Sequence, residues 1–461
     1  MKKLWFLSLL IVVLLALPAL AACGTTDEPA TTAPPATSAT TAPPATTGSG
    51  DTTPTTAPAS TDTTLGAPVK LYVGGTFALT GAYAEDCAAV LAGFEDYVKW
   101  VNENHMVAPW LADKTVPANI SFELLWGDDA LAPDKTMTIY QDLLSKGLLV
   151  ERVSGTPQVM ALKDLLIEDN VGSTSQGVPP ATLMPPGNIF LKSPIYTDAM
   201  YAVAQWFMDS WKDTTRKPRV AYLTADAALG RTIDIPEMQA ALEALGYEFA
   251  GAQFVPLVPT APPTTQLAWL KEHNVDLTLG IMVNPGAQPT VKEALRLGMG
   301  PDQAYKITFA FCEPGHLQIM VPDLGEVANG VVVGGDYCAV DADVPGIAFS
   351  NLLQETYRPN NKNDNIMYQA GLVEAMLQVE ALRLASLAGD PSKLTPEDVL
   401  KKGFWQIKGF DTGGICMTPL TYGEGDVQGL DSIRIQQVQA GKIVELGDYP
   451  MPTTSILPAA K

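Results

Sequence analysis

The chain has 461 residues, of which 47% are hydrophobic, and a formal net charge of −21 at pH 7. Such an acidic chain is poorly suited to bind nucleic-acid phosphates, so we expect no nucleic-acid partner. The length is sufficient for a folded body of about two ordinary lobes.

The first residues have the pattern of a secretory signal peptide, which we assign to residues 1–22. Lysines stand at the start, Leu4–Leu15 is almost wholly apolar, and two alanines precede Cys23. The sequence LAAC at residues 20–23 resembles a bacterial lipobox, which implies acylation of Cys23 and a lipid anchor in the cell membrane. The alternative is an uncleaved membrane-spanning anchor, for which the apolar stretch is borderline in length.

Residues 23–67 are predicted to be a disordered tether that begins at the lipidated cysteine. The segment consists mainly of Thr, Pro, Ala and Ser and has almost no large apolar side chain. It cannot bury enough surface to offset the entropy cost of ordering. Its prolines favour an extended chain, which would hold a folded body away from the membrane surface.

Strand and helix patterns alternate from residue 69 onward. In the segment 84–104, apolar residues recur mostly at spacings of three and four, which predicts an amphipathic helix. The other elements expected in this first series are strands at 69–75, 120–129, 148–155 and 171–175, and helices at 134–145 and 157–168.

A second series of elements begins after residues 189–192. We expect strands at 219–226, 247–255, 275–282, 305–311 and 330–337, and helices at 235–245, 265–273, 289–297 and 367–387. Two final strands at 432–439 and 442–446 are joined by Ala440-Gly441, which indicates a hairpin. Alternation of this kind predicts an α/β fold of two doubly wound, Rossmann-like lobes. Ligands of such folds collect at the carboxyl ends of the strands, between the lobes.

Five segments in the same order resemble the leucine/isoleucine/valine-binding family of type I periplasmic solute-binding proteins. They are VKLYVGGTFALTGAYAEDCAAVLAGFEDYVKWVNEN, KPRVAYLTADAALGRTIDIPEMQAALEALGYEF, ANGVVVGGDY, YQAGLVEAMLQVEALRLA and LTPEDVLKKGFWQIKGFDTGGICMTPLTYGEGD. The resemblance implies a receptor that captures a small solute in a cleft, closes about a three-segment hinge, and delivers the solute to an ABC permease.

The resemblance also implies how the chain is divided between the lobes. Lobe 1 would combine residues 68–193 with 337–422, and lobe 2 would combine residues 194–336 with 423–461, which include the C-terminal tail. The three crossings would lie near Pro194, Asp336 and Tyr422.

Three loops of lobe 1 are candidates for contact with the solute. Helix starts offer unpaired N–H groups to an anion, and the family holds the carboxylate of its ligand there. The alternative role of these residues is helix capping or a solvated loop. Where the family usually has Ser-Pro, this chain has a Ser-Gln pair, so a bulkier amide enters the cleft. The candidates are Thr80, Tyr83, Ser154, Thr156, Ser175 and Gln176.

In lobe 2, Glu313 matches the acidic position that pairs with the ammonium of an amino acid in the family, because a desolvated ammonium needs a charged partner. The alternative is a surface carboxylate. Two family aromatics are replaced here, by Leu229 and by Val283 with Asn284. We expect Leu229 and Val283 to form a more aliphatic wall and Asn284 to supply a polar contact. Tyr196, Trp206 and Tyr337 could restore aromatic surface or could pack in the core.

The sequence favours a binding protein over an enzyme. It has no Gly-x-Ser-x-Gly elbow, no HExxH motif and no phosphate-binding loop, and its three histidines are far apart. His316, near Cys312, is more simply explained as a turn residue. No spacing typical of metal ligands occurs, and we expect neither metal nor cofactor. The remaining cysteines allow three disulfide pairings, and buried thiols are equally compatible: Cys87, Cys312, Cys338 and Cys416.

We therefore predict an extracytoplasmic substrate-binding lipoprotein of an ABC importer that acts as a monomer. Its solute is expected to be an amino acid or a related carboxylate or amide. The alternative function is a ligand-sensing receptor of the same fold that signals to a partner protein, because a fold does not dictate a role.

Overall fold

The structure is a computed structural model that describes residues 66–312, 315–363 and 365–459. The chain divides into two units, residues 1–63 and 64–461, and all described residues belong to the second. The predicted signal peptide, Cys23 and most of the tether therefore lie outside the described residues, as does Glu313. No helix in the described segments is long and apolar enough to cross a membrane.

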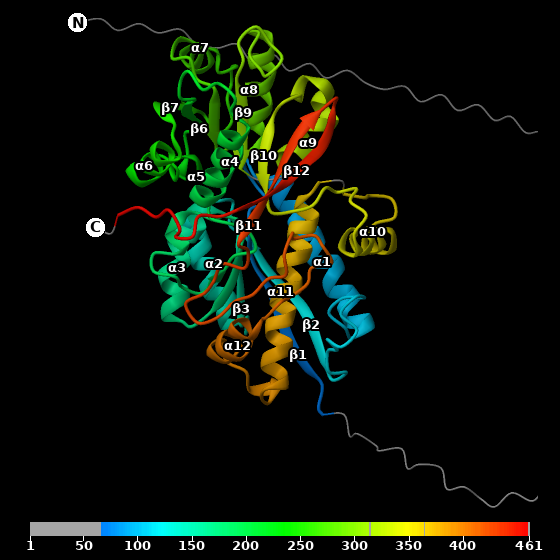
Figure 1. Cartoon of the computed structure of the whole chain (residues 1–461). Coiled ribbons are helices and arrows are strands. Elements are labelled where there is room, and N and C mark those ends of the chain that lie inside the picture. Colours follow the sequence, from blue (N-terminus) through cyan, green and yellow to red (C-terminus); the bar gives the residue numbers. More distant parts are fainter. Residues whose placement is uncertain (1–65, 313–314, 364, 460–461) are drawn as a thin grey trace, which may run out of the picture. The chain divides into compact units, whose positions relative to one another are not determined.

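The first series of elements builds parallel strands covered by helices (Figure 1). β1 (Val69–Phe77) pairs in parallel with β2 (Ile120–Asp128), and β4 (Gly172–Ser175) lies between β3 (Val150–Val153) and β5 (Ile189–Phe190). The associated helices are α1 (Ala84–Asn104), α2 (Pro133–Ser145), α3 (Thr156–Glu168), α11 (Met367–Leu387) and α12 (Pro396–Lys402).

The second series forms one seven-stranded sheet in the order β12-β11-β10-β9-β8-β6-β7. β6 to β10 run parallel, whereas β11 and β12 form an antiparallel hairpin at the β10 edge. Its strands are β6 (Arg219–Ala225), β7 (Glu248–Val255), β8 (Leu277–Gly280), β9 (Thr308–Cys312), β10 (Val332–Gly335), β11 (Ser432–Gln439) and β12 (Lys442–Pro450). The remaining helices are α4 (Tyr196–Ser210), α5 (Ala228–Arg231), α6 (Pro236–Leu245), α7 (Thr264–Glu272), α8 (Asn284–Arg296), α9 (Gly315–Leu324) and α10 (Pro345–Tyr357).

The predicted α/β fold class is confirmed, including the two series of strands and the final hairpin. Helices α4, α5, α9, α10 and α12 were not predicted. The predicted boundaries between lobes stay a prediction. In the structure β11 pairs with β10, so that β11 and β12 belong to the second sheet.

Helix α11 is buried along almost its whole length, so it shows little amphipathic pattern. It crosses α1 at two glycines. A Cβ on Gly93 would lie 2.4 Å from the Tyr368 carbonyl oxygen, and one on Gly371 would lie 2.1 Å from the Val90 carbonyl oxygen. Glycine at both positions lets the helix backbones touch, and this brings the polar residues of α11 under the β1–β3 strands.

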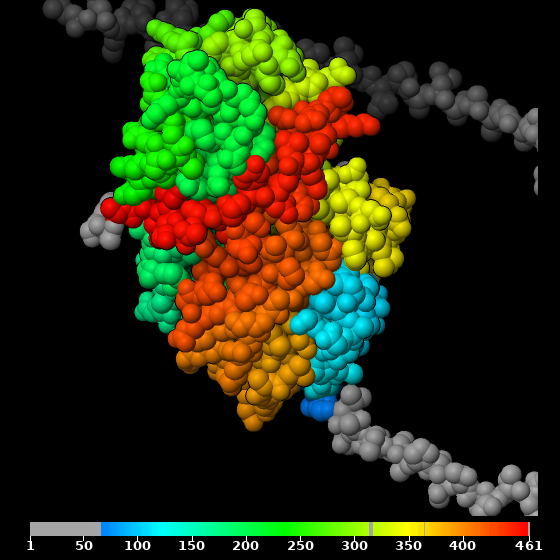
Figure 2. All heavy atoms as spheres, viewed as in Figure 1, coloured from blue at the N-terminus to red at the C-terminus, as the bar shows by residue number. Residues whose placement is uncertain are grey.

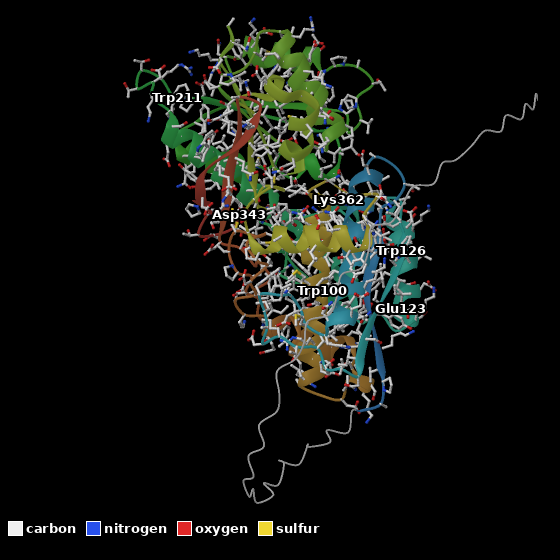
Figure 3. All side chains as sticks on the ribbon, turned by 90° about the vertical axis from the view of Figure 1, so that its right-hand side faces the viewer. Trp100, Glu123, Trp126, Trp211, Asp343 and Lys362 are labelled. Carbon is white, nitrogen blue, oxygen red and sulfur yellow. The ribbon has the colours of Figure 1, made fainter. Side chains whose placement is uncertain are left out.

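Aromatic packing joins α1 to α10. Trp100 of α1, labelled in Figure 3, meets Phe349 of α10 edge to face with ring centroids 4.6 Å apart. Such pairs add about 0.5–1.5 kcal/mol beyond the area they bury. Cys87, Cys338 and Cys416 are buried free thiols, and Cys312 is buried as well.

The C-terminal tail crosses the start of α4. Thr197 Oγ1 donates to the Ile456 carbonyl oxygen at 2.8 Å, and the Ile456 amide donates to Asp198 Oδ1 at 2.8 Å. Figure 2 shows the red C-terminal segment on the surface, between green residues of the second sheet and the orange residues that precede the hairpin.

Candidate functional site

A cavity of about 100 Å³ lies where loops of the two strand series face each other. On one side are the loops after β1, β2, β3 and β4, and on the other are the loops after β6, β7 and β8 together with the start of α4. This is the expected position, at the carboxyl ends of parallel strands. The lining residues are Ala82, Tyr83, Leu131, Ser154, Gly155, Thr156, Pro157, Gln176, Gly177, Tyr196, Ala227, Ala228, Leu229, Leu257 and Val283.

The structure brings five of the predicted site residues together in this cavity. They come from the residue before α1, the β3–α3 loop, the start of α3, the loop after β4, and α5, most of which are far apart in the chain. These residues are Tyr83, Ser154, Thr156, Gln176 and Leu229. Their proximity fulfils a condition for a shared site, while their contact with a solute stays a prediction.

The other predicted residues lie elsewhere. Thr80 is exposed, its hydroxyl donates to Asp128 Oδ2 at 3.3 Å, and α1 begins only at Ala84, so Thr80 does not cap that helix. Ser175 is buried, and its hydroxyl donates to the Gly177 carbonyl oxygen at 2.7 Å, which holds the turn at the cavity wall. Asn284 lines a separate pocket beside the cavity.

The hydroxyls at the cavity have partners within the protein. Ser154 Oγ donates to the buried carboxylate of Asp129, which also accepts from Thr136 Oγ1 at 3.1 Å. Thr156 Oγ1 lies 3.4 Å from Tyr196 Oη. Tyr196, which the sequence left open between core packing and the site, therefore belongs to the cavity wall, where it supplies aromatic surface.

The β3–α3 loop and the loop after β4 touch through their backbones. A Cβ on Gly177 would lie 2.4 Å from the Thr156 amide nitrogen. Only glycine allows this approach, because a methyl group at that distance would displace the start of α3. Helix α3 has no side-chain cap at Gly155, so its first turn is presented at the cavity without a competing carboxylate or hydroxyl cap.

The wall formed by the second series is largely aliphatic. Leu229, Val283 and Leu257 line the cavity from this side, and Leu131, in the loop after β2, lines it from the other. No sequence pattern pointed to Leu131 or Leu257, because isolated leucines in loops carry no periodicity. The cavity thus combines an apolar body with a few polar groups, which is the usual composition of small-molecule sites.

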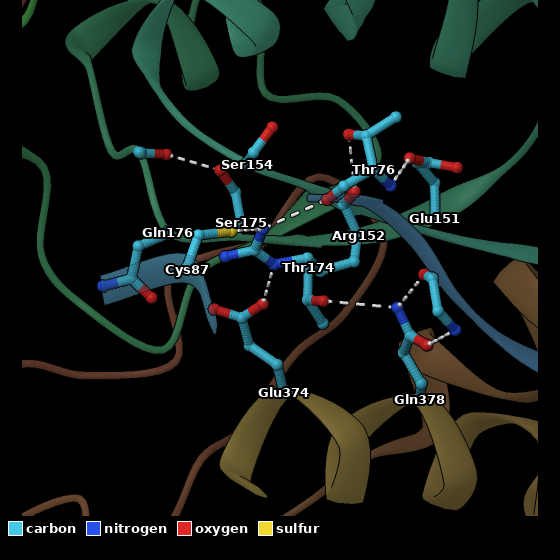
Figure 4. Close-up of polar contacts among 12 residues, drawn as sticks. Thr76, Cys87, Glu151, Arg152, Ser154, Thr174, Ser175, Gln176, Glu374 and Gln378 are labelled. Carbon is cyan, nitrogen blue, oxygen red and sulfur yellow. Dashed lines mark hydrogen bonds and ion pairs between the residues drawn. The ribbon is translucent and has the colours of Figure 1, made fainter. Parts of the chain in front are cut away.

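Four ionisable side chains form a buried cluster close to the cavity, and Figure 4 shows three of them, Glu151, Arg152 and Glu374. Glu374 of α11 forms two ion pairs. Its Oε2 lies 2.9 Å from Arg152 Nε, and its Oε1 lies 3.0 Å from Lys192 Nζ. Glu151 precedes Arg152 on β3, and its Oε1 accepts from the Thr76 amide at 2.9 Å. All four side chains are almost fully shielded from solvent.

Arg152 ties the cluster to β1. Its Nη1 donates to the Thr76 carbonyl oxygen at 3.1 Å, and its guanidinium carbon lies 4.7 Å from the centroid of the Phe77 ring. Burial acts to lower the pKa of Arg152, but the Glu374 carboxylate, together with smaller contributions from Cys87 and Tyr83, raises it. Gln378, one turn further along α11, adds a bond to the β1 backbone: its Oε1 accepts from the Gly74 amide at 2.8 Å.

This cluster was not predicted from the sequence. A Glu-Arg pair inside the otherwise apolar strand β3, and polar residues along an apolar helix, were the available signals. Within the described residues, no group of three or more His, Cys, Asp or Glu side chains is arranged to hold a metal ion.

Glu151→Gln should stabilise the protein increasingly as the pH rises. Burial raises the pKa of Glu151 well above 4.5, so the folded state resists its ionisation, whereas the unfolded chain ionises near 4.5. The free energy of unfolding of the wild type therefore falls as the pH rises above 4.5 toward the raised pKa of Glu151. At pH 8 the variant should be more stable by about 1–3 kcal/mol, the cost of an unsatisfied buried polar group. Urea unfolding at pH 4.5 and pH 8 measures this.

The matched control is Glu123→Gln, since Glu123 lies on the exposed side of β2 and pairs with Lys70. That variant should not gain stability with pH. If Glu151→Gln and the wild type differed in free energy of unfolding by the same amount at both pH values, the raised pKa of Glu151 would be contradicted.

The family described as "Periplasmic binding protein" matches residues 70–442 of the chain. No curated protein matches it in sequence. Among solved structures, a branched-chain amino acid ABC transporter protein from Thermus thermophilus with bound valine is similar. It has a TM-score of 0.73 and 20% identity, with 84% of this chain and 98% of that chain covered.

Two further structures are similar in fold. A fatty acid ABC transporter substrate-binding protein from Thermomonospora curvata has a TM-score of 0.68 and 20% identity, with 85% of this chain and 95% of that one covered. A solute-binding protein of R. palustris in complex with benzoate has a TM-score of 0.64 and 17% identity, with 86% and 99% covered.

Proposed function

Because the chain belongs to the periplasmic binding protein family, we propose that it captures a small solute in the cavity between its two strand series and delivers it to the permease of an ABC importer. The observation that carries the proposal is the cavity itself. Ser154 and Thr156 border it from one series, and Leu229 and Val283 border it from the other. A solute there would be held from both sides, which couples its binding to closure.

The proposed solute has a compact apolar body and a small polar end. Aliphatic side chains and Tyr196 would contact the body, while Gln176 and the first turn of α3 would contact the polar end. Structures of similar fold hold valine and benzoate, which share this division into an apolar body and a carboxylate. An amino acid or a related carboxylate or amide remains the proposed class.

The proposed location is outside the cytoplasm, with Cys23 carrying the lipid anchor. The pattern LAAC at residues 20–23 and the tether that follows support this assignment. Mass spectrometry of the N-terminal peptide from native membranes tests it. A diacylglyceryl mass on Cys23 is expected, and an intact peptide that includes residues 1–22 would contradict the anchor.

Solute capture should raise the melting temperature of the purified protein. A ligand at 100 times its Kd adds about 2.7 kcal/mol to stability by mass action, equivalent to a rise of several degrees. We expect such a rise with at least one member of a library of amino acids, aliphatic and aromatic carboxylates and their amides. Absence of any rise across all of these classes would contradict the proposed function.

A further inference from the structure

Lys192 is a buried lysine whose ammonium contacts Gln176, a residue that lines the cavity. It is 1% exposed. Its Nζ lies 3.0 Å from Glu374 Oε1, 3.3 Å from the Ser175 carbonyl oxygen and 3.3 Å from Gln176 Oε1. The ammonium thus joins the charge cluster to the side-chain amide of Gln176, a residue that lines the cavity.

The ammonium determines which way the amide of Gln176 points. An ammonium can only donate hydrogen bonds, so the amide turns its oxygen toward Lys192 and its nitrogen away. Among the described residues, the hydrogen-bond acceptor of Gln176 Nε2 is Met367 Sδ at 3.5 Å, and a thioether is a weak acceptor. The amide therefore has N–H capacity that a stronger acceptor on a solute would use.

The charge cluster fixes Lys192 in place. Glu374 holds the ammonium through Oε1, while its Oε2 is held by Arg152 Nε at 2.9 Å. With both carboxylate oxygens engaged and the whole group buried, rotation of the lysine away from Gln176 would leave charges unpaired inside the protein.

We propose that Lys192 is a positioning residue that holds Gln176 as a hydrogen-bond donor toward the cavity, so that the site selects solutes with an acceptor at that point and rejects solutes with a cationic donor there. The selection rests on the proposed function of solute capture, whereas the orientation of the amide does not.

The orientation is tested without any solute, by combining Gln176→Glu with Lys192→Met. In the wild-type background the new carboxylate would meet the Lys192 ammonium, and the melting temperature should change by less than roughly 2 °C. In the Lys192→Met background the same carboxylate would be buried without a partner, and the melting temperature should fall by roughly 5–10 °C more than Lys192→Met alone lowers it.

Lys114→Met provides the matched control. Lys114 also pairs with a buried glutamate of α11, with its Nζ 2.8 Å from Glu380 Oε1, but it does not line the cavity. Gln176→Glu should cost no more in the Lys114→Met background than in the wild type. Equal effects of Gln176→Glu in the Lys192→Met and wild-type backgrounds would overturn the proposal, whether or not the protein binds a solute.

Selection is tested by calorimetry with benzoate and benzylammonium, which share one apolar body and differ in the polar group. The wild type should bind benzoate at least roughly tenfold more tightly. Lys192→Met should reduce this ratio at least roughly fivefold, and Lys114→Met should leave it unchanged. Lys192→Gln keeps a donor next to Gln176 Oε1. Its preference for benzoate over benzylammonium should therefore lie between those of Lys192→Met and the wild type. A ratio that Lys192→Met does not change would overturn the proposal.

Discussion

Replacement of Glu374 by Gln should lower the free energy of unfolding by about 3–5 kcal/mol, the usual cost of removing one partner from a buried ion pair. Glu374 is fully buried and is the common partner of Arg152 and Lys192. Its loss would leave both cations inside the protein with only neutral acceptors. Urea denaturation of the purified variant at pH 7 measures the change.

The control for this prediction is Glu397→Gln. Glu397 pairs with Lys401 on the exposed surface of α12, where solvent screens the attraction. That variant should unfold at nearly the wild-type urea concentration. If Glu374→Gln behaved in the same way, the charge cluster would not contribute to the fold as we infer.

Leu229→Trp should fill the cavity and weaken solute binding roughly 10–100-fold. Leu229 borders the cavity from the side of the seven-stranded sheet, and the larger indole would occupy much of its volume of about 100 Å³. Overpacking of an enclosed site costs about 1–3 kcal/mol, which equals this loss in affinity. Calorimetry with the solute that most raises the melting temperature of the wild type measures the effect.

Leu387→Trp serves as the control, since Leu387 is 60% exposed at the end of α11 and does not line the cavity. It should bind the solute as the wild type does. Wild-type affinity in Leu229→Trp would mean that the solute binds elsewhere.

The alternation of strand and helix patterns was enough to predict the fold class, because buried parallel strands are short apolar runs separated by amphipathic helices. It did not predict α4. Its first turn carries the polar residues Thr197 and Asp198, which conceal the start of the helix in the sequence and are buried in the fold, where they bind the C-terminal tail. Pro289 lies inside α8 and is the predicted start of this helix, which in fact begins at Asn284.

The site was predictable where residues follow strands. Ser154, Thr156 and Gln176 follow β3 and β4, and parallel strands bring such loops to one edge. The contribution of Leu257 was not predictable, and that of Tyr196 was left open, because both depend on how the two strand series face each other. The proposed role of Lys192 was not predictable from the sequence. Its partner Glu374 lies far from it along the chain, and its partner Gln176 lies on another loop.

The most direct test of solute capture is a crystal structure of the protein grown with the solute that most raises its melting temperature. We predict electron density for that solute between the first turn of α3 at Thr156 and the aliphatic wall at Leu229, with an acceptor atom within hydrogen-bond distance of Gln176 Nε2. Density for the solute at any other place, with this cavity empty, would contradict the account.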